Sequence, residues 1–452
     1  MMKTCDERQV NKENWGVIVM KWSDWDTNLK VRLLGEGVMN LLFWMFFPFM
    51  AIYFSDSFGK EMAGMLLIAS QVVSVMVGLI GGYCADHFGR KRMMIIASIG
   101  EAVCFVFFAL SNSPFLTSPM LTFISFSALG MFGALYWPAS HAMVADVVPE
   151  KHRSSVFAVF YTSINISVVI GPILGGIFFF DYRFPFLIVC LGISVILTFV
   201  LQKFIRETAP EREKREKQAD EKDVKWTHYL IQQLEDYRVI VKDKIFLLFV
   251  LAGILVAQTF MQLDLLMAVY TTEFVPKQTL FSLGDWSLSI DGKQAFSWII
   301  SENGLLVALF TVFMNRWMLK YPEKRVFILS ALFYGVGIII FGHTISIWVM
   351  FAAMVIFTAA ELMVVGIQES FVSKLAPSHM RGQYFAASSL RFTIGRTIAP
   401  LAIPMTVWFG YSTTFIILGI LAALSAALYG IMFKMIEQQR TAKKKPAAAV
   451  VK

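Results

Sequence analysis

Charged residues are scarce in this sequence. Asp, Glu, Lys and Arg make up 16% of its 452 residues, against 57% hydrophobic residues, whereas soluble globular proteins carry about 25% charged residues. Cysteines are also few: the four present have no paired spacing, so we expect no disulfide framework and no zinc site. The motifs G-x-x-x-x-G-K-[ST], H-E-x-x-H and G-x-S-x-G are absent, which argues against ATP-driven and hydrolytic chemistry. We therefore predict a protein that is not an enzyme and holds no cofactor or metal.

The hydrophobic residues are concentrated in long blocks. A helix needs about 20 mostly apolar residues to cross the roughly 30 Å hydrocarbon core of a bilayer. Lipid offers no partners to unpaired backbone groups, so such blocks are helical. Twelve of them lie at 31–55, 62–85, 92–111, 119–146, 154–179, 183–205, 245–272, 296–317, 325–345, 347–373, 381–407 and 409–434. The sequence thus predicts an all-α polytopic protein with twelve transmembrane helices in the lipid bilayer.

Lys and Arg mark one side of that membrane. They occur in the N-terminal tail and in every second loop, for example at 90–92 and 316–325, whereas loop 111–119 has none. Because basic loops stay in the cytoplasm, we expect a multi-pass protein of the cell membrane with both termini cytoplasmic. The net charge of +8 is then a topology signal, and we expect no nucleic-acid partner.

A highly charged stretch divides the chain into two halves. Residues 206–225 contain seven basic and seven acidic residues, a composition too polar to bury. The apolar spacing of residues 226–241 fits a helix lying on the membrane surface. We expect a cytoplasmic tail (1–30), an N-terminal six-helix bundle (31–205), a cytoplasmic linker with a surface helix (206–244), a C-terminal six-helix bundle (245–434) and a second cytoplasmic tail (435–452).

The two halves resemble each other in sequence. Three positions of the first half recur 228 residues later. They are Pro149, Arg153 and Pro172, which recur as Pro377, Arg381 and Pro400. Parallel repeats of two six-helix bundles are a transporter arrangement in which substrate is handled between the bundles. The two bundles are therefore predicted to be pseudo-symmetric.

The loop after the second block carries a motif. It reads GGYCADHFGRKR, with Gly82, Asp86, Gly89, Arg90, Lys91 and Arg92 at the spaced positions. This pattern resembles the signature of the major facilitator superfamily, with His87 where the family usually has Arg or Lys. The resemblance implies the major facilitator fold and a cytoplasmic gate in which Asp86 and Arg90 act with Asp146. The alternative is a basic loop that only sets topology.

A second motif lies in the fifth block. The segment GPILGG comprises Gly171, Pro172, Gly175 and Gly176. Glycines four residues apart permit close helix packing, and proline bends a helix. The segment resembles the fifth-span signature of drug:proton antiporters, although the upstream glycines and the fourth-span arginine of many such proteins are missing. The chain is thus most similar to bacterial twelve-span multidrug efflux proteins.

Acids inside the blocks are candidates for proton coupling. An ionisable group at the centre of a membrane helix costs on the order of 2.5–3.5 kcal/mol, so it faces a cavity or a partner. Glu36, Asp264 and Glu361 lie on the first, seventh and tenth blocks, which the family resemblance places around the central cavity. Asn40 shares a helix face with Glu36. Permanent ion pairs are the alternative to proton exchange.

Two arginines lie deep in the eleventh block. Five positions separate Arg391 from Arg396, which places them roughly 140° apart on a helix. We expect Arg391 to face the bundle interior and pair with an acid of the seventh or tenth block. We expect Arg396 to turn toward a neighbouring helix or an anionic group.

The function that these features predict is secondary-active transport. We expect proton-coupled export of amphipathic small molecules by alternating access, in a monomer whose ligands are the small-molecule substrate and protons. Asp264 or Glu361 would carry the proton, with Arg391 adjusting its affinity. One alternative is a carrier for a lipid-like or anionic metabolite, bound by the deep arginines. Another is a non-transporting sensor on the same fold.

Overall fold

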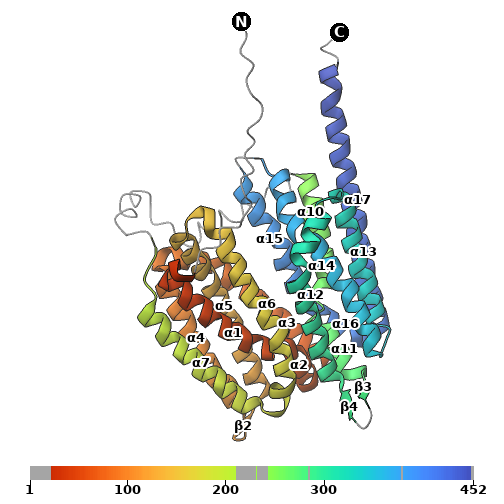
Figure 1. Cartoon of the computed structure of the whole chain (residues 1–452). Coiled ribbons are helices and arrows are strands. Elements are labelled where there is room, and N and C mark those ends of the chain that lie inside the picture. Colours follow the sequence, from red (N-terminus) through yellow and green to blue (C-terminus); the bar gives the residue numbers. More distant parts are fainter. Residues whose placement is uncertain (1–21, 210–230, 232–242, 284–285, 378–379, 449–452) are drawn as a thin grey trace.

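The computed structural model describes residues 22–209, 231, 243–283, 286–377 and 380–448 (Figure 1). The first helical bundle, which we call the N bundle, follows a short 3-10 helix η1 (Trp22–Asp24). Its elements are α1 (Thr27–Phe46), η2 (Phe47–Phe49), α2 (Met50–Phe58), α3 (Lys60–Phe88), α4 (Arg90–Leu110), α5 (Pro119–Val147), α6 (Glu150–Asp181) and α7 (Arg183–Phe204). Together α1, η2 and α2 form one broken span, so the N bundle has the six predicted spans.

The second bundle, the C bundle, has six spans as well. Its elements are α10 (Lys244–Phe260), α11 (Leu266–Phe274), α12 (Gly292–Met318), α13 (Glu323–Phe341), α14 (Ile347–Leu375), α15 (Arg381–Ile398), η3 (Ala399–Leu401), α16 (Ala402–Phe409) and α17 (Tyr411–Ala448). In the described part of the chain, 10 spans are long and apolar enough to cross a membrane. The broken pairs α10–α11 and α15–α16 complete the predicted twelve. The expected fold class is confirmed.

Most of the predicted linker and tails lies outside the described residues. This applies to 1–21, to 210–230 and 232–242 with the predicted surface helix, and to 449–452. The described parts extend the helices beyond the predicted bundles, since α1 begins at Thr27 and α17 runs to Ala448. The linker joins α7 to α10, and we call that end of the molecule the linker end.

Two β-hairpins mark the opposite end, which we call the hairpin end. Strands β1 (Asn112–Ser113) and β2 (Leu116–Thr117) pair between α4 and α5. Strands β3 (Gln278–Leu283) and β4 (Trp286–Ile290) pair between α11 and α12. Both lie at the lower edge in Figure 1. The sequence predicts helices as the regular structure, so the two hairpins are small antiparallel additions to the all-α fold.

The two bundles meet toward the hairpin end. There α3 packs on α16 and α2 on α11, and α6 of the N bundle runs along α12 of the C bundle. One apolar cluster contains residues of both bundles, with Phe49 of η2 edge-on to Phe296 of α12. In Figure 1 the bundles diverge toward the linker end. The two bundles are therefore closed against each other at the hairpin end.

Candidate functional site

Glu36 lies in a buried ion pair within the N bundle. Arg32, one turn earlier on α1, donates from Nε to Glu36 Oε1 (2.7 Å) and from Nη2 to Oε2 (2.9 Å). The hydroxyls of Tyr136 and Ser140 donate to the same carboxylate at 3.0 and 2.5 Å. Arg32 and Glu36 are 1% and 6% exposed. Of the two interpretations that the sequence left open for Glu36, the structure contains the fixed ion pair.

A cavity of about 310 Å³ adjoins this ion pair. We call it the N-bundle pocket. Asn40 lines it together with Arg32 and Glu36, so the predicted neighbours Glu36 and Asn40 do share one space. Its remaining walls are mainly aromatic: Trp137, His141, Phe157, Phe160 and Tyr161. The Arg32 guanidinium lies 4.5 Å from the ring centre of Phe160. Such a wall suits an apolar or cationic group.

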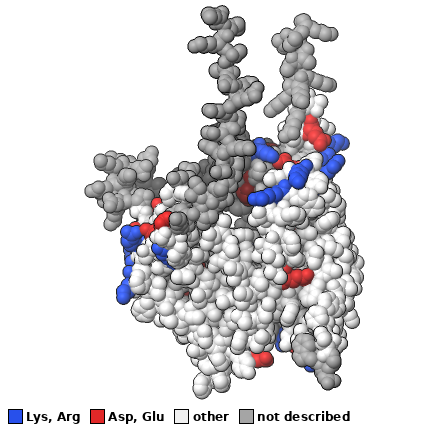
Figure 2. Space-filling view, viewed as in Figure 1, with Lys and Arg blue, Asp and Glu red and all other residues white. Residues whose placement is uncertain are grey.

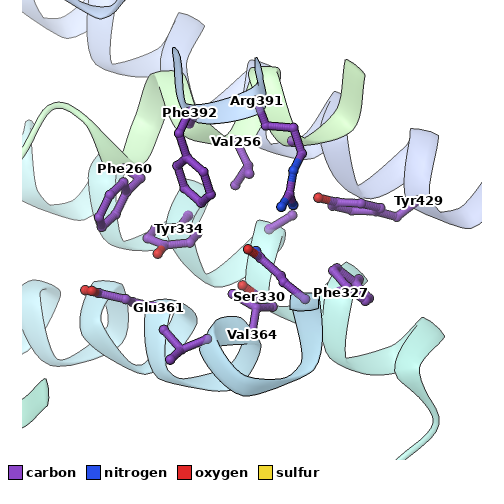
Figure 3. Close-up of a pocket in the computed structure, with 15 residues that line it drawn as sticks. Val256, Phe260, Phe327, Ser330, Tyr334, Glu361, Val364, Arg391, Phe392 and Tyr429 are labelled. Atoms are coloured by element: carbon purple, nitrogen blue, oxygen red, sulfur yellow. The ribbon is translucent and has the colours of Figure 1, made fainter. Parts of the chain in front are cut away.

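Arg391 faces the interior of the C bundle, as expected, but the described residues contain no ion pair between it and an acid. Glu369 of α14 interacts with it only electrostatically, beyond ion-pair distance. Its Nε donates to the Ser388 carbonyl (2.9 Å), and its guanidinium lies 4.3 Å from the ring centre of Phe249. Figure 3 shows the guanidinium directed toward the Tyr429 hydroxyl. The expected ion pair is therefore wrong. Gly253 leaves room for the aliphatic part of Arg391 against α10, which brings the charge to aromatic faces and not to a carboxylate.

Arg391 and Glu361 line one cavity of about 180 Å³, which we call the C-bundle pocket. The Glu361 carboxylate has a partner on a neighbouring helix. Its Oε2 accepts a hydrogen bond from Asn303 Nδ2 of α12 (3.2 Å). In Figure 3 the Glu361 carboxylate and the Arg391 guanidinium lie at opposite sides of the pocket. Glu361 is thus a partly buried acid whose partner in the described structure is a neutral amide.

Asp264 lies at the break between α10 and α11. Residues 261–265 form a turn there, and the Gln262 side chain donates to the carbonyls of Gln258 (2.7 Å) and Ala399 (3.2 Å). Asp264 interacts electrostatically with Arg396 of α15, although the described residues contain no ion pair between them. Arg396 is exposed. The structure thus separates the exposed Arg396 from the buried Arg391, and the group that Arg396 faces stays a prediction.

The loop motif forms a charge cluster at the linker end. Arg90 Nη1 contacts Asp86 Oδ1 (2.6 Å), and Arg90 Nε lies 3.4 Å from Asp146 Oδ2. The three predicted gate residues therefore meet. A gate at the linker end would bond only when that end is closed. The bundles diverge there (Figure 1), yet Asp86 and Arg90 are already paired, because both belong to the N bundle and lie on either side of Gly89.

Other residues of the motif have structural contacts. Lys91 Nζ donates to the Gln202 carbonyl at 2.8 Å, while Arg92 is exposed. Gly82 lies in α3 next to Gly81, and it is Gly81 that approaches the backbone of α5 at Ala134. Gly89 has φ +97°, a conformation that glycine adopts without strain.

Glu207, which the sequence analysis does not single out, completes the cluster. Its carboxylate accepts the backbone N–H groups of Arg90 (2.9 Å) and Lys91 (3.2 Å), and so caps the start of α4. Gly89 has no side chain, and one there would overlap the Glu207 carboxylate. Partial burial alone would raise the pKa of Glu207, but hydrogen bonds from four backbone amides outweigh it and lower that pKa.

The glycine motif of the fifth span lies where helices touch. A side chain at Gly171 would overlap Trp44 of α1, and one at Gly175 would overlap the Met45 carbonyl. Gly176 faces Ser297 of α12 in the other bundle. Pro172 lies inside α6, which continues through it. The motif therefore lines both the α1 contact and the interface between bundles.

Comparison with known proteins fits this architecture. The sequence profile described as the Major Facilitator Superfamily matches residues 33–284 and 279–451. The chain belongs to the major facilitator superfamily. Members of this superfamily among its relatives and fold neighbours are transporters, so the protein is a membrane transporter and not an enzyme.

Individual relatives and structures differ in how far the similarity extends. A protein of Planococcus maritimus named "Na(+), Li(+), K(+)/H(+) antiporter" is 55% identical over 423 residues, which cover 94% of this chain and 100% of that protein. The multidrug resistance protein MdtH of Salmonella choleraesuis is 29% identical over 154 residues, 33% of this chain and 37% of that protein. A crystal structure of a POT family transporter in complex with 5-aminolevulinic acid superposes with a TM-score of 0.71 at 17% identity, covering 90% of this chain and 96% of that one.

The sequence contained one signal for the residues that were missed. Arg32 precedes Glu36 by four positions, the spacing at which opposite charges meet on a helix. Glu207 and Tyr429 have no such local signal. Each acts on a residue far away in the chain, so only the fold brings them to their partners.

Proposed function

We propose that this protein exchanges protons for monovalent cations across the membrane by alternating access. The observation that carries the proposal is the 55% identity, over all of the relative and 94% of this chain, to the Planococcus maritimus Na(+), Li(+), K(+)/H(+) antiporter. Antiport agrees with the expected secondary-active, proton-coupled mechanism. The expected substrate changes, from amphipathic molecules to small cations.

Exchange of this kind needs a carboxylate that binds either a proton or a cation. Glu36 is poorly suited, because Arg32 already neutralises it through two short hydrogen bonds. Glu361 and Asp264 form no ion pair in the described part of the chain. The neutral Asn303 amide bonds to Glu361, and Arg396 acts on Asp264 from beyond ion-pair distance. An unpaired carboxylate in a membrane protein is stabilised when a counter-ion binds. These two acids are our candidates for the exchange site.

We also infer the orientation and the functional unit. Lys and Arg gather toward the linker end on the face seen in Figure 2, and the positive-inside rule places that end in the cytoplasm of a cell-membrane protein. Each pocket lies within a single six-helix bundle. A single chain thus holds both, and a monomer is the functional unit that we propose.

The test is cation-driven proton movement in liposomes. Purified protein is reconstituted with a trapped pH-sensitive dye, and Na⁺, Li⁺ or K⁺ is added outside. We expect the internal pH to rise with each cation, and Glu361→Gln or Asp264→Asn to abolish the rise if that acid is the carrier. Asp181→Asn, at an exposed acid ending α6, is the matched control. No pH change with any of the three cations in the wild-type protein would refute cation antiport.

A second candidate is the originally expected export of amphipathic molecules. It is favoured by the aromatic wall of the N-bundle pocket, whose volume of about 310 Å³ lies at the lower end of the roughly 300–1,000 Å³ range of small-molecule sites. The similarity of about a third of the chain to MdtH points the same way. In the same liposomes, proton movement driven by a lipophilic cationic dye, and not by Na⁺, Li⁺ or K⁺, would favour this candidate.

A further inference from the structure

Two polar side chains beside Glu361 have no place in the sequence-based predictions. Asn303 of α12 donates from Nδ2 to Thr358 Oγ1 (3.0 Å) and to Glu361 Oε2 (3.2 Å). Asn303 and Thr358 are 5% and 0% exposed. Thr358 and Glu361 are three residues apart and so share a face of α14, and that helix packs on α12. Three oxygen-bearing side chains thus meet between two helices of the C bundle.

We propose that Asn303, Thr358 and Glu361 form the binding site for the monovalent cation. This inference rests on the proposed antiport and assigns its cation site. Glu361 supplies the negative charge and Thr358 a hydroxyl oxygen, and hard cations are bound by oxygen ligands of these kinds. Asn303 supplies its side-chain carbonyl after the amide turns over, which exchanges an oxygen and a nitrogen of similar size.

The amide gives the site two states. Without a cation, Asn303 Nδ2 donates to the Glu361 carboxylate and so stabilises its charge in a surrounding that disfavours charge. With a cation, Oδ1 faces the ion and the hydrogen bond to the carboxylate is released. A proton on Glu361 removes the charge that attracts the cation. Proton and cation therefore exclude each other, as exchange requires.

The other groups around Glu361 leave its charge available. Tyr334 of α13 and Tyr161 of α6 lie within electrostatic range of it. Arg391 and Tyr429 line the same pocket, but the guanidinium is directed to Tyr429 across the pocket (Figure 3). Arg391 is the one full positive charge in the lining of this pocket, and it is fixed by Ser388 and Phe249.

The experiment measures Na⁺ binding and transport in matched variants. Thr358→Val keeps the shape of the side chain and loses the hydroxyl, whereas Thr358→Ser keeps the hydroxyl. Asn303→Leu keeps the size and loses both polar atoms. We expect Thr358→Val and Asn303→Leu to raise the half-saturating Na⁺ concentration on the order of tenfold, and Thr358→Ser to remain close to wild type. Binding of radioactive Na⁺ to the purified protein in detergent gives the same quantity without transport.

A pH series separates this role from helix packing. If Glu361 binds both ions, the half-saturating Na⁺ concentration of the wild type rises up to about tenfold per pH unit on acidification. Asn303→Leu should keep that slope at weaker affinity, and Glu361→Gln should lose Na⁺ binding. Melting temperatures are recorded in parallel. Variants at Asn303 and Thr358 that melt earlier but bind Na⁺ like the wild type would overturn the proposed site. That outcome would leave antiport intact, whereas a wild type without cation-driven proton movement would refute antiport itself.

Discussion

Among the described residues, Arg32 and Glu36 are surrounded by hydroxyl and aromatic groups, with His141 in the same pocket lining and no second Lys or Arg. Removing Arg32 alone would leave a carboxylate unpaired in the protein interior, which costs about 3–5 kcal/mol. We therefore expect Arg32→Met to lower the melting temperature of the purified protein strongly. The double variant Arg32→Met/Glu36→Gln should recover much of the loss, because no charge then stays buried alone. Thermal unfolding in detergent measures both effects.

The same pair of variants tests whether Glu36 carries protons. If the ion pair is structural, the double variant keeps cation-driven proton movement once it is folded. Equal melting temperatures for Arg32→Met and wild type would contradict a structural pair. Loss of coupling in a stable double variant would return Glu36 to the list of carriers.

Single residues show where sequence reasoning stops. The depth of Glu36, Glu361 and Arg391 could be predicted, because it follows from their positions within apolar blocks. Their partners could not. Arg391 has an aromatic surrounding because Gly253 and Phe249 of α10 pack against it, and neither lies near it in the sequence. The cost of burying a charge predicts that the charged group has a partner, but it does not predict which group that partner is.

Whole helices were more predictable than their interruptions. The number of spans follows from the length of each apolar block, since lipid leaves the backbone no other choice. The break between α10 and α11 has no proline or glycine and is held by Gln262, whose amide reaches carbonyls of two helices. The repeat pairs Pro172 with Pro400, yet Pro172 lies within the continuous α6 and Pro400 lies in η3. The same residue thus has different consequences in two packing environments.

The start of α4 depends on a side chain that is distant in the sequence, because Glu207 follows the last helix of the N bundle. Since the pKa of Glu207 is lowered in the folded protein, its stabilising effect is present above the unfolded-state pKa. That effect is lost as the pH falls through the folded-state pKa. We expect Glu207→Gln to destabilise the protein by a few tenths to about 1 kcal/mol near neutral pH. The difference from wild type should begin to shrink as the pH falls below the unfolded-state pKa of about 4.3, and it should vanish only below the lower folded-state pKa of Glu207.

Melting temperatures measured from about pH 2 to about pH 8 provide the check, because this range includes the pH values at which the folded-state carboxylate becomes protonated. Glu437→Gln serves as the control, because Glu437 is exposed and, among the described contacts, its carboxylate bonds to the Lys324 side chain and not to backbone amides. A pH-independent effect of Glu207→Gln would mean that the carboxylate charge contributes nothing at the start of α4.

At the scale of the whole molecule, ion pairs within one bundle and the ion pair between bundles lie at different ends of the protein. Those near the linker end join groups of the same bundle, as Asp86–Arg90 and Glu323–Lys374 do. Among the described residues, the ion pair that joins the two bundles is Lys60–Glu273 (2.6 Å), near the hairpin end. The two-bundle plan was predictable from the charged linker and the repeat. Which end is closed was not, because it depends on contacts between residues far apart in the sequence.

The contacts at the hairpin end predict how the closed state can be weakened. Besides Lys60, Glu273 binds the Tyr411 hydroxyl (2.6 Å), and all three groups are partly exposed. Such a pair contributes about 0.2–1 kcal/mol, which changes a two-state population by up to roughly fivefold. We expect Glu273→Gln to favour opening at the hairpin end.

Spin labels at Ser57 and Lys277 should then move apart, while labels at Arg92 and Lys374 near the linker end move together. The charge-swapped variant Lys60→Glu/Glu273→Lys should restore the wild-type distances in part. If both ends of the molecule widened in Glu273→Gln, the bundles would be loosening without alternating, and Lys60–Glu273 would be a structural brace with no part in the transport cycle.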